Sequence, residues 1–195
     1  MNKPILILAS TSSYRRALLD RLQIPFEQVK PDYIEQEEPS ESPTHMALRQ
    51  AEGKARSISP DAENYIVIGS DQVAHIGEEK FGKPGDKTNA LRQIARFQGK
   101  WVTFTTAICL MTSQGPPRNA VESYAIKFRS LSDDEIERYL DRDQPYDCAG
   151  SIKVESLGIT LLEDAKGRDI TTLYGLPLML LREELYALQK YNILL

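Results

Sequence analysis

The sequence contains little cysteine and little histidine, which limits the metal and disulfide chemistry open to it. Its 195 residues include only Cys109, Cys148, His45 and His75 of these two types. The cysteines form no CxxC pair and the histidines have no ligand spacing, so the sequence argues against a structural zinc site. A disulfide-dense secreted scaffold is excluded as well, although a single disulfide stays open.

Basic charge and long apolar runs are also scarce. The chain has 24 basic and 28 acidic residues and a formal net charge of −4. We therefore expect no nucleic-acid polymer as a partner, because such binding depends on many Lys and Arg, while a local pocket for a small anion stays open. The apolar run at residues 5–9 is too short for a signal-peptide core or a membrane span. We expect a cytoplasmic protein with no membrane partner.

Two common catalytic motifs are missing. The chain has no G-x-x-x-x-G-K-[ST], which argues against a P-loop. It has no G-x-S-x-G elbow and no suitable histidine partner for a serine, which argues against a serine hydrolase. The hydrophobic fraction of 41% nevertheless supplies enough apolar material for a real core, and the length suits one domain or two small lobes.

The sequence does contain a mixture of strand and helix patterns. Apolar, β-branched runs predict strands at residues 5–9, 65–76, 101–112 and 119–130. Apolar residues at helical spacing predict helices at residues 12–22, 44–58, 89–97, 132–140 and 175–188. Ser12, Thr44 and Ser132 are the predicted N-caps of three of these helices, and Gly69 is expected to interrupt the second strand.

Two segments show weaker patterns. Residues 31–43 are acidic and contain proline, so they are expected to form an exposed loop, and residues 149–167 are expected to supply short strands. Strands and helices do not alternate strictly along the chain. We therefore expect a mixed sheet rather than a purely parallel one.

The N-terminal segment ILILASTSSYRRALLDRL joins an apolar strand to a helix through the hydroxyl residues Ser10 to Ser13. The first N–H groups of such a helix are unsatisfied and its dipole attracts negative charge. Arg15 and Arg16 could each contact two phosphate oxygens, so the segment indicates an anion site suited to phosphate. An ordinary capped helix with solvent-facing arginines fits the same pattern and is the commoner case for one segment alone.

The stretch IGSDQV places Asp71 after a Gly-Ser pair, at the expected end of a buried strand. A carboxylate there could bind a divalent cation or activate water, or it could cap a turn, and the two hypotheses are evenly matched. Lys83 in the stiff FGKP loop, Lys54 on the second helix and Glu35 in the acidic loop are further candidates. For each of these three taken alone, a solvated surface charge is the simpler explanation.

The stretch AGSIKVES places Lys153 and Glu155 two residues apart. On a strand, this spacing puts both side chains on one face, where one or both could reach a site. Cross-strand surface charges are the simpler explanation of the pair.

Five segments together resemble a known family. They are LILASTSSYRRALLDRL, IGSDQV, FGKP, CAGSIKVESLGITL and GRDITTLYGLPL. In order and spacing they are similar to the Maf family of nucleoside triphosphate pyrophosphatases, over about Ile5 to Leu181. The likeness is greatest to the branch described as 7-methyl-GTP pyrophosphatases. That branch has an aromatic residue before the paired arginines, GSDQ at the catalytic strand and K-x-E after AGS, and the corresponding residues here are Tyr14, Gln72 and Glu155.

The resemblance implies an α/β fold, similar to inosine triphosphate pyrophosphatases, with an extended mixed sheet flanked by helices and two lobes around a central cleft. It implies a single Maf-like domain over residues 1–195. The implied activity is house-cleaning hydrolysis of the α–β phosphate bond of a small-molecule nucleotide, above all 7-methyl-GTP, to a nucleoside monophosphate and pyrophosphate. A divalent cation, Mg²⁺ or Mn²⁺, is the implied cofactor.

The resemblance also implies roles for residues. Asp71 corresponds to the family's proton acceptor. The other active-site positions are Ser10, Arg15, Glu35, Lys54 and Lys83, and the positions associated with base choice are Tyr14, Gln72 and Glu155. This chain has Ser12-Ser13 where the family usually has Ser-Pro, and Tyr14 where the branch more often has tryptophan. We expect slightly looser preorganisation and a weaker partner for a cation, but not loss of activity.

Two other functions stay open. The chain could be a nucleotide-binding regulator of cell division that acts through a partner, or a pyrophosphatase that prefers dTTP or UTP. A regulator would not need a carboxylate beside a triphosphate, since that charge weakens anion binding unless a metal intervenes. The presence of Asp71 therefore favours the enzyme. A homodimer is compatible with such folds, and the sequence leaves the oligomeric state open.

Overall fold

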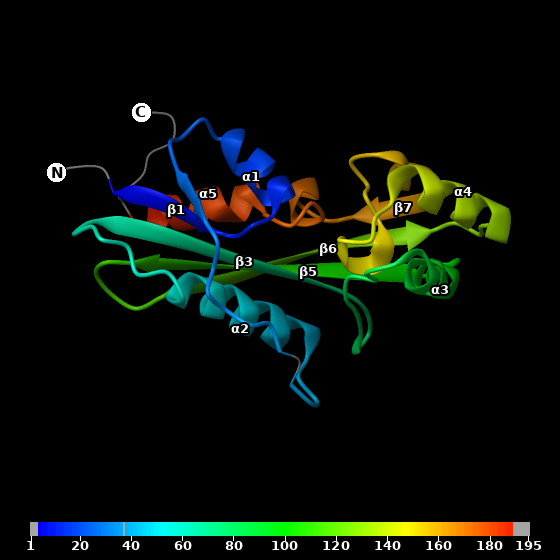
Figure 1. The fold of residues 1–195 in the computed structure, drawn as a ribbon, viewed down its shortest axis with the longest axis horizontal. Coiled ribbons are helices and arrows are strands. Elements are labelled where there is room, and N and C mark those ends of the chain that lie inside the picture. The colour runs from blue at the N-terminus through cyan, green and yellow to red at the C-terminus, as the bar shows by residue number, and fades with distance from the viewer. Residues whose placement is uncertain (1–3, 37, 189–195) are drawn as a thin grey trace.

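The computed structural model describes residues 4–36 and 38–188, which form one mixed sheet with helices on both faces (Figure 1). The strands are β1 Ile5–Ala9, β2 Glu27–Val29, β3 Tyr65–Ile76, β4 Glu79–Phe81, β5 Trp101–Thr112, β6 Arg118–Phe128 and β7 Leu162–Lys166. The helices are α1 Ser13–Asp20, α2 Pro43–Arg56, α3 Lys87–Phe97, α4 Asp133–Asp143 and α5 Leu178–Ala187, with short 3₁₀ turns at Ala149–Ser151, Leu157–Leu161 and Ile170–Thr172. In this part of the chain, no helix is long and apolar enough to cross a membrane.

The sheet order is β2-β1-β3-β5-β6-β7, with β4 paired to the far end of β3. β1 runs parallel to β2 and β3, whereas β3, β5, β6 and β7 pair with one another antiparallel, so the expected mixed sheet is confirmed. β3 and β5 each have 12 residues and pair along almost their whole length. They extend from one end of the molecule to the other (Figure 1).

Three clusters of buried apolar side chains divide the molecule into two lobes. In the first lobe, alternate residues of β3 face opposite ways: Ile66 and Ile68 pack under α1 and α5, whereas Val67 packs under α2. The third cluster fills the second lobe, where Phe97 of α3 and Tyr139 of α4 pack against the far ends of the long strands. The lobes share the sheet, so its strands set the distance between them.

Several local predictions need correction. β3 is continuous through Gly69, because the glycine allows α2 to lie directly on the strand. The N-cap of α2 is Ser42 rather than Thr44, and Pro43 occupies the first helical turn, where its missing N–H has no cost. Residues 149–167 form 3₁₀ turns and only one strand, β7, so Lys153 and Glu155 do not share a strand face. The other predicted helices and strands are present, with ends displaced by a few residues.

Candidate active site

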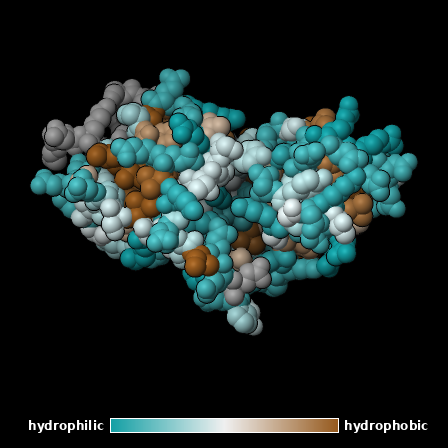
Figure 2. All heavy atoms as spheres, in the orientation of Figure 1, coloured by the Kyte–Doolittle hydropathy of each residue, from teal (hydrophilic) through white to brown (hydrophobic). Residues whose placement is uncertain are grey.

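A cavity of about 690 Å³ lies between the lobes. Figure 2 shows the molecule narrowed and hollowed between its two ends. All nine residues predicted for the site line this cavity: Ser10, Tyr14, Arg15, Glu35, Lys54, Asp71, Gln72, Lys83 and Glu155. They come from both lobes and from segments far apart in the sequence, so the fold assembles the predicted set in one place.

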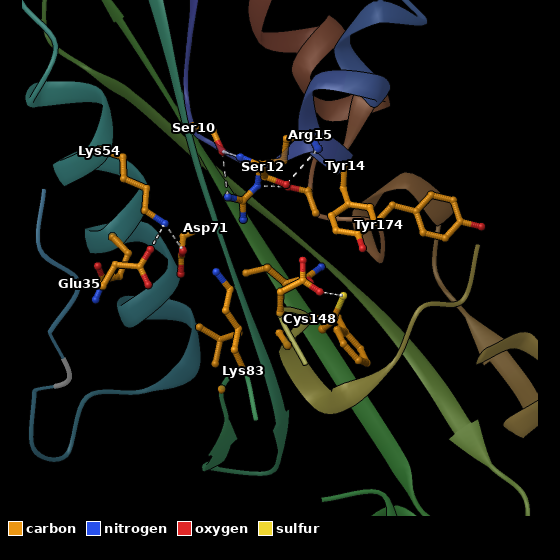
Figure 3. A pocket seen from close by; sticks show the side chains of 18 of the residues that line it. Ser10, Ser12, Tyr14, Arg15, Glu35, Lys54, Asp71, Lys83, Cys148 and Tyr174 are labelled. Carbon is orange, nitrogen blue, oxygen red and sulfur yellow. Dashed lines mark hydrogen bonds and ion pairs between the residues drawn. The ribbon is translucent and has the colours of Figure 1, made fainter. Parts of the chain in front are cut away.

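The N-terminus of α1 forms a cradle of donors at one side of the cavity (Figure 3). Ser12 caps the helix by accepting a hydrogen bond from the Arg15 backbone N–H at 3.3 Å. The hydroxyl of buried Ser10 accepts one from the Ser12 N–H at 3.1 Å. These bonds fix the turn between β1 and α1, and the helix dipole favours an anion in front of it.

The Arg15 side chain is held across this cradle. Its Nε donates to the Gly175 carbonyl at 2.9 Å and its Nη1 to the Ser10 hydroxyl at 3.5 Å. Burial lowers the pKa of the Arg15 guanidinium, while the charges of Asp71 and Glu35 act in the opposite direction. Arginine stays charged in proteins, so the cavity has a fixed positive group beside the helix N-terminus.

Lys54 joins two carboxylates (Figure 3). Its Nζ lies 2.6 Å from Asp71 Oδ1 and 2.6 Å from Glu35 Oε1. Lys54 and Asp71 are buried, with 6% and 8% of their surfaces exposed, whereas the Glu35 side chain is half exposed. Lys54 is therefore no solvated surface lysine, and Asp71 has a fixed orientation in the cavity.

Gly69 explains how Lys54 reaches Asp71. A Cβ at this position would lie 2.1 Å from the Ala51 carbonyl oxygen and 2.8 Å from the Ala55 nitrogen of α2. Only glycine allows this close approach, which brings the helix face with Lys54 onto the strand. Asp71 lies two residues further along β3, on the same face. The prediction that Asp71 ends a strand was wrong, since β3 continues to Ile76.

The loop with Glu35 is fastened to α2. The Gln36 carbonyl accepts hydrogen bonds from Arg49 Nη2 at 2.8 Å and Gln50 Nε2 at 2.7 Å, and Arg49 also pairs with Glu41 at 2.6 Å. Burial raises the pKa of Glu35, but the charges of Lys54, Lys83 and Arg15 outweigh it and hold the pKa below its ordinary value. Glu35 is thus an ionised carboxylate facing the cations of the cavity.

Lys83 approaches from the second lobe, in the loop after β4. Its side chain is exposed and extends toward Asp71 (Figure 3). It lies close enough to Glu35 to help lower the pKa of that carboxylate. Among the cationic side chains that line the cavity, Arg15 and Lys54 come from the first lobe and Lys83 comes from the second.

The rest of the cavity contains the residues predicted to select a base. Glu155 is exposed, and within the described part of the chain it has neither a hydrogen bond nor an ion pair. The amide nitrogen of Gln72 is engaged within the protein, because it donates to Thr106 Oγ1 at 3.0 Å and to the carbonyls of Thr172 at 2.8 Å and Leu173 at 3.1 Å. These bonds tie Gln72 to the chain segment before α5.

This geometry agrees with a match to a known family. A family model described as Maf-like protein matches residues 5–188. The chain belongs to the Maf family. That membership and the expected α/β fold are thereby confirmed, since the match covers both lobes and every residue of the predicted site.

Individual Maf relatives are similar over nearly their whole lengths. A protein of Alcanivorax borkumensis is 45% identical over 94% of each chain, and one of Aromatoleum aromaticum is 49% identical over 93% of this chain and 94% of its own. Both are named 7-methyl-GTP pyrophosphatase. Among solved structures, the Staphylococcus aureus Ham1 protein has a TM-score of 0.52 at 14% identity and covers 93% of this chain and 98% of its own, which shows a common fold alone.

The Maf family implies a divalent cation, and the donors present fit one that arrives with its substrate. Among the described residues, no group of three or more His, Cys, Asp and Glu side chains could hold a metal by itself. Asp71 and Glu35 do converge, since an oxygen of each contacts the same ammonium of Lys54. Mg²⁺ commonly uses one or two carboxylates, waters and substrate phosphates, and these two carboxylates suit that arrangement.

Sequence reasoning missed several residues around the cavity of this Maf protein. Asp147, Cys148 and Tyr174 line it, and Gly175 provides the carbonyl that holds Arg15. Both cysteines are free thiols. The only signal for Tyr174 and Gly175 was the GRDITTLYGLPL motif, to which no role had been given. Cys148 likewise begins the CAGSIKVESLGITL motif, whereas Asp147 lies outside all five motifs.

Proposed function

We propose that this protein is a nucleoside triphosphate pyrophosphatase that hydrolyses the α–β phosphate bond of 7-methyl-GTP. Water adds to phosphorus, the bond to the bridging oxygen breaks, and the products are 7-methyl-GMP and pyrophosphate. The observation that carries this proposal is the buried Asp71 carboxylate, held by Lys54 in the same cavity as the cradle of Ser10, Ser12 and Arg15. The names of the relatives support the choice of nucleotide.

The cationic residues have the task of binding the triphosphate. Arg15, Lys83 and the N–H groups at the start of α1 neutralise phosphate charge that would otherwise repel an incoming nucleophile. A bound Mg²⁺ or Mn²⁺ supplies further charge neutralisation on the phosphate oxygens. Asp71 and Glu35 are the residues that would hold this cation.

Asp71 has the task of activating water. Its carboxylate accepts a proton as the attacking water adds to phosphorus, and Lys54 fixes the direction in which the carboxylate oxygens point. Because Lys54 is itself buried, its ammonium stays with the carboxylates instead of moving into solvent. This leaves Asp71 anchored, which is what a general base needs to contact one water in a defined position.

The base end of the cavity suits a cationic ring. Methylation at N7 of guanine gives the ring a positive charge, and Glu155 is a carboxylate without a competing partner among the described residues. Tyr14 can stack on the ring, with a cation–π contribution of roughly 0.5–2 kcal/mol. Gln72 contributes by holding the segment at Thr172 and Leu173.

The decisive experiment is pyrophosphate release by the purified protein, with and without Mg²⁺ or Mn²⁺. The substrates are 7-methyl-GTP, GTP, UTP, CTP and dTTP, and the Asp71→Asn variant is measured in parallel. We expect metal-dependent release, fastest with 7-methyl-GTP, and loss of release in the variant. Tight nucleotide binding without release in either protein would instead favour a regulator, and a preference for dTTP or UTP would reject the proposed substrate.

Three further properties belong to the same proposal. They are a cytoplasmic location, one Maf-like domain over the whole chain and, as an open alternative to a monomer, a homodimer. Sedimentation of the purified protein, with and without substrate, measures the last of these directly.

A further inference from the structure

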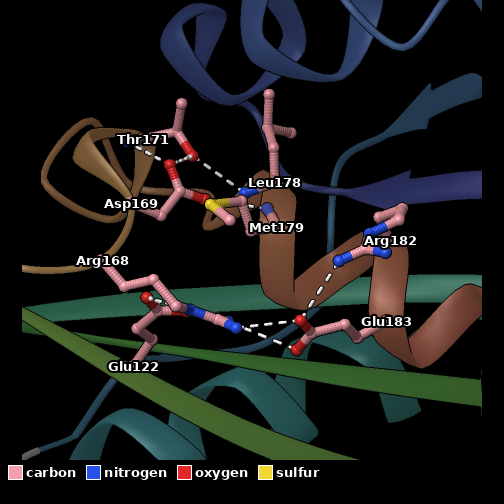
Figure 4. Close-up of polar contacts among 8 residues, drawn as sticks. All are labelled: Glu122, Arg168, Asp169, Thr171, Leu178, Met179, Arg182 and Glu183. Atoms are coloured by element: carbon pink, nitrogen blue, oxygen red, sulfur yellow. Dashed lines mark hydrogen bonds and ion pairs between the residues drawn. The ribbon is translucent and has the colours of Figure 1, made fainter.

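A buried aspartate outside the cavity organises the segment before α5 (Figure 4). Asp169 is 6% exposed, and its carboxylate accepts three hydrogen bonds. Oδ1 accepts from the Thr171 backbone N–H at 2.9 Å and from the Thr171 hydroxyl at 2.6 Å, while Oδ2 accepts from the Met179 N–H at 2.8 Å. The Thr171 hydroxyl in turn accepts from the Leu178 N–H at 2.8 Å.

These bonds replace a missing helix cap. The N-cap position of α5 is Pro177, whose side chain makes no capping hydrogen bond. The first two N–H groups of the helix, at Leu178 and Met179, are satisfied by Thr171 and Asp169 from the preceding turn. The charge of Asp169 also lies at the positive end of the helix dipole, which favours it there.

The segment fixed in this way is connected to the active site at its other side. The Gly175 carbonyl accepts from Arg15 Nε at 2.9 Å and from the hydroxyl of buried Ser70 at 3.0 Å. Gly175 has a φ of +98°, in the left-handed region that favours glycine, so the direction of this carbonyl depends on a tight turn. The Thr172 carbonyl accepts from Gln72 and Thr106.

We propose that Asp169 is a positioning residue for Arg15: by capping α5 it fixes the turn at Thr171–Gly175, and the Gly175 carbonyl then aims the guanidinium at the phosphates. This inference rests on the proposed function, because it takes Arg15 as a phosphate-binding group. Asp169 is not among the residues that line the cavity, so it acts through the turn that it holds. Its loss should change phosphate binding through Arg15, whose Nε donates to the Gly175 carbonyl of this turn.

The test measures binding of inorganic tripolyphosphate by calorimetry, so that it does not depend on turnover. In Asp169→Asn, one carboxylate oxygen becomes an NH₂ group facing an N–H or O–H donor, and the turn loses a bond. We expect tripolyphosphate affinity to fall by about tenfold or more, the scale of a displaced charged contact. Ser132→Ala is the matched control, since it removes the cap of α4 in the other lobe and should leave the affinity unchanged.

A double-mutant cycle separates positioning from general loss of stability. The Arg15→Lys variant lacks the guanidinium that the Gly175 carbonyl holds in place. In that background, Asp169→Asn should therefore weaken tripolyphosphate binding by less than twofold. Additive effects in the cycle, or a single-variant affinity within twofold of wild type, would overturn the proposal. All binding is measured well below the Tm of each variant.

A second pair of variants covers the case in which Asp169→Asn does not fold. Thr171→Val removes the hydroxyl that links Asp169 to Leu178, whereas Thr171→Ser keeps it. We expect weakened tripolyphosphate binding in the first and near wild-type binding in the second, and equal binding in both would reject the inference. Wild-type protein that binds tripolyphosphate but releases no pyrophosphate from nucleotides would contradict the proposed function and leave this inference standing.

Discussion

Lys54 donates a hydrogen bond of 2.6 Å to Asp71, and both side chains are almost completely buried. A buried ion pair of this kind is costly to break, because removing one partner leaves an uncompensated charge in the interior. Here the pair lies at the wall of a cavity and also includes Glu35. Its arrangement therefore links the stability of the first lobe to the chemistry of the site.

Removing the Lys54 charge should lower both the stability of the protein and its rate of pyrophosphate release. Lys54→Met is expected to lower the free energy of unfolding by about 3 kcal/mol, the lower end for a broken buried pair. Pyrophosphate release should fall by about 100-fold, since Asp71 and Glu35 would repel each other and lose their orientation. Urea unfolding and steady-state assays measure the two effects. Lys87→Met, at an exposed lysine paired with Asp141, is the control, and equal behaviour of the two variants would contradict this account.

The close contact between α2 and β3 gives a second prediction. Gly69→Ala places a Cβ 2.1 Å from the Ala51 carbonyl oxygen, so the helix must move away from the strand. We expect a stability loss of about 3 kcal/mol, as for severe overpacking, together with reduced activity because Lys54 moves with the helix. Gly82→Ala should be stable, since nothing lies within 4 Å of a Cβ there. Thermal unfolding of both variants measures these differences in stability. A Gly69→Ala protein as stable as wild type would show that the packing of α2 on β3 does not require glycine at this position.

Two carboxylates that line the cavity, Glu155 and Asp147, should differ in their effect on substrate choice. Glu155 has no partner among the described residues, whereas Asp147 lies 4.0 Å from the Lys153 ammonium, which partly neutralises it. Glu155→Gln should lower the ratio of 7-methyl-GTP to UTP turnover about threefold to fivefold, as expected for an exposed charge pair worth up to about 1 kcal/mol. Asp147→Asn should change the ratio less. Competition assays with both nucleotides in one reaction give the ratio directly. An unchanged ratio in Glu155→Gln would show that Glu155 does not determine substrate choice.

The Cys148 thiol should be unreactive although it lines the cavity. Burial, and next the charge of Asp147, raise the pKa of Cys148 to about 12. Because the thiolate is the nucleophile, alkylation by iodoacetamide at pH 7.5 should be at least about tenfold slower than for an unfolded control. Mass spectrometry of the native protein over time measures this rate. Rapid modification of the native thiol would show that the cavity opens far more than the structure indicates.

Glu35 should make stability depend on pH in a defined range. Its pKa in the folded protein lies below the ordinary value of 4.5, so the unfolded chain binds the proton more readily. The stabilisation is fully present above about pH 4.5 and is lost as the pH falls through the lower, folded pKa. The difference in unfolding free energy between wild type and Glu35→Gln should therefore shrink below pH 4.5. Urea unfolding from pH 3 to pH 7 tests this, and a difference that grows toward acid would contradict the sign.

Much of the fold could be predicted because its signals are local. The long apolar runs at β3 and β5 and the caps at Ser12 and Ser132 depend on neighbours in sequence alone. The prediction of short strands at residues 149–167 was mostly wrong, because the buried residues there do not follow the alternation of a strand. Gly150, for example, packs against side chains from distant segments.

The site shows the limit of local reasoning more sharply. Lys54 looks like a surface lysine on its helix, and its burial depends on Gly69, fifteen positions away on a strand. The sequence around Gln72 does not show that its amide nitrogen has partners within the protein. The carbonyls that accept its hydrogen bonds belong to residues about 100 positions later in the chain. Only the ordered set of family motifs brought these residues together, and it gave no geometry.

The register of β1 against β3 pairs Ala9, the residue before Ser10, with Gly69, which lies two residues before Asp71. Side chains alternate along a strand, so a slip of β1 by a single residue would turn its side chains to the opposite face of the sheet. A misfolded molecule of that kind could remain compact while the proposed phosphate cradle at Ser10 and the proposed general base, Asp71, no longer faced the same cavity. A test for the proposed pyrophosphate release would thus also test whether β1 is aligned correctly on β3.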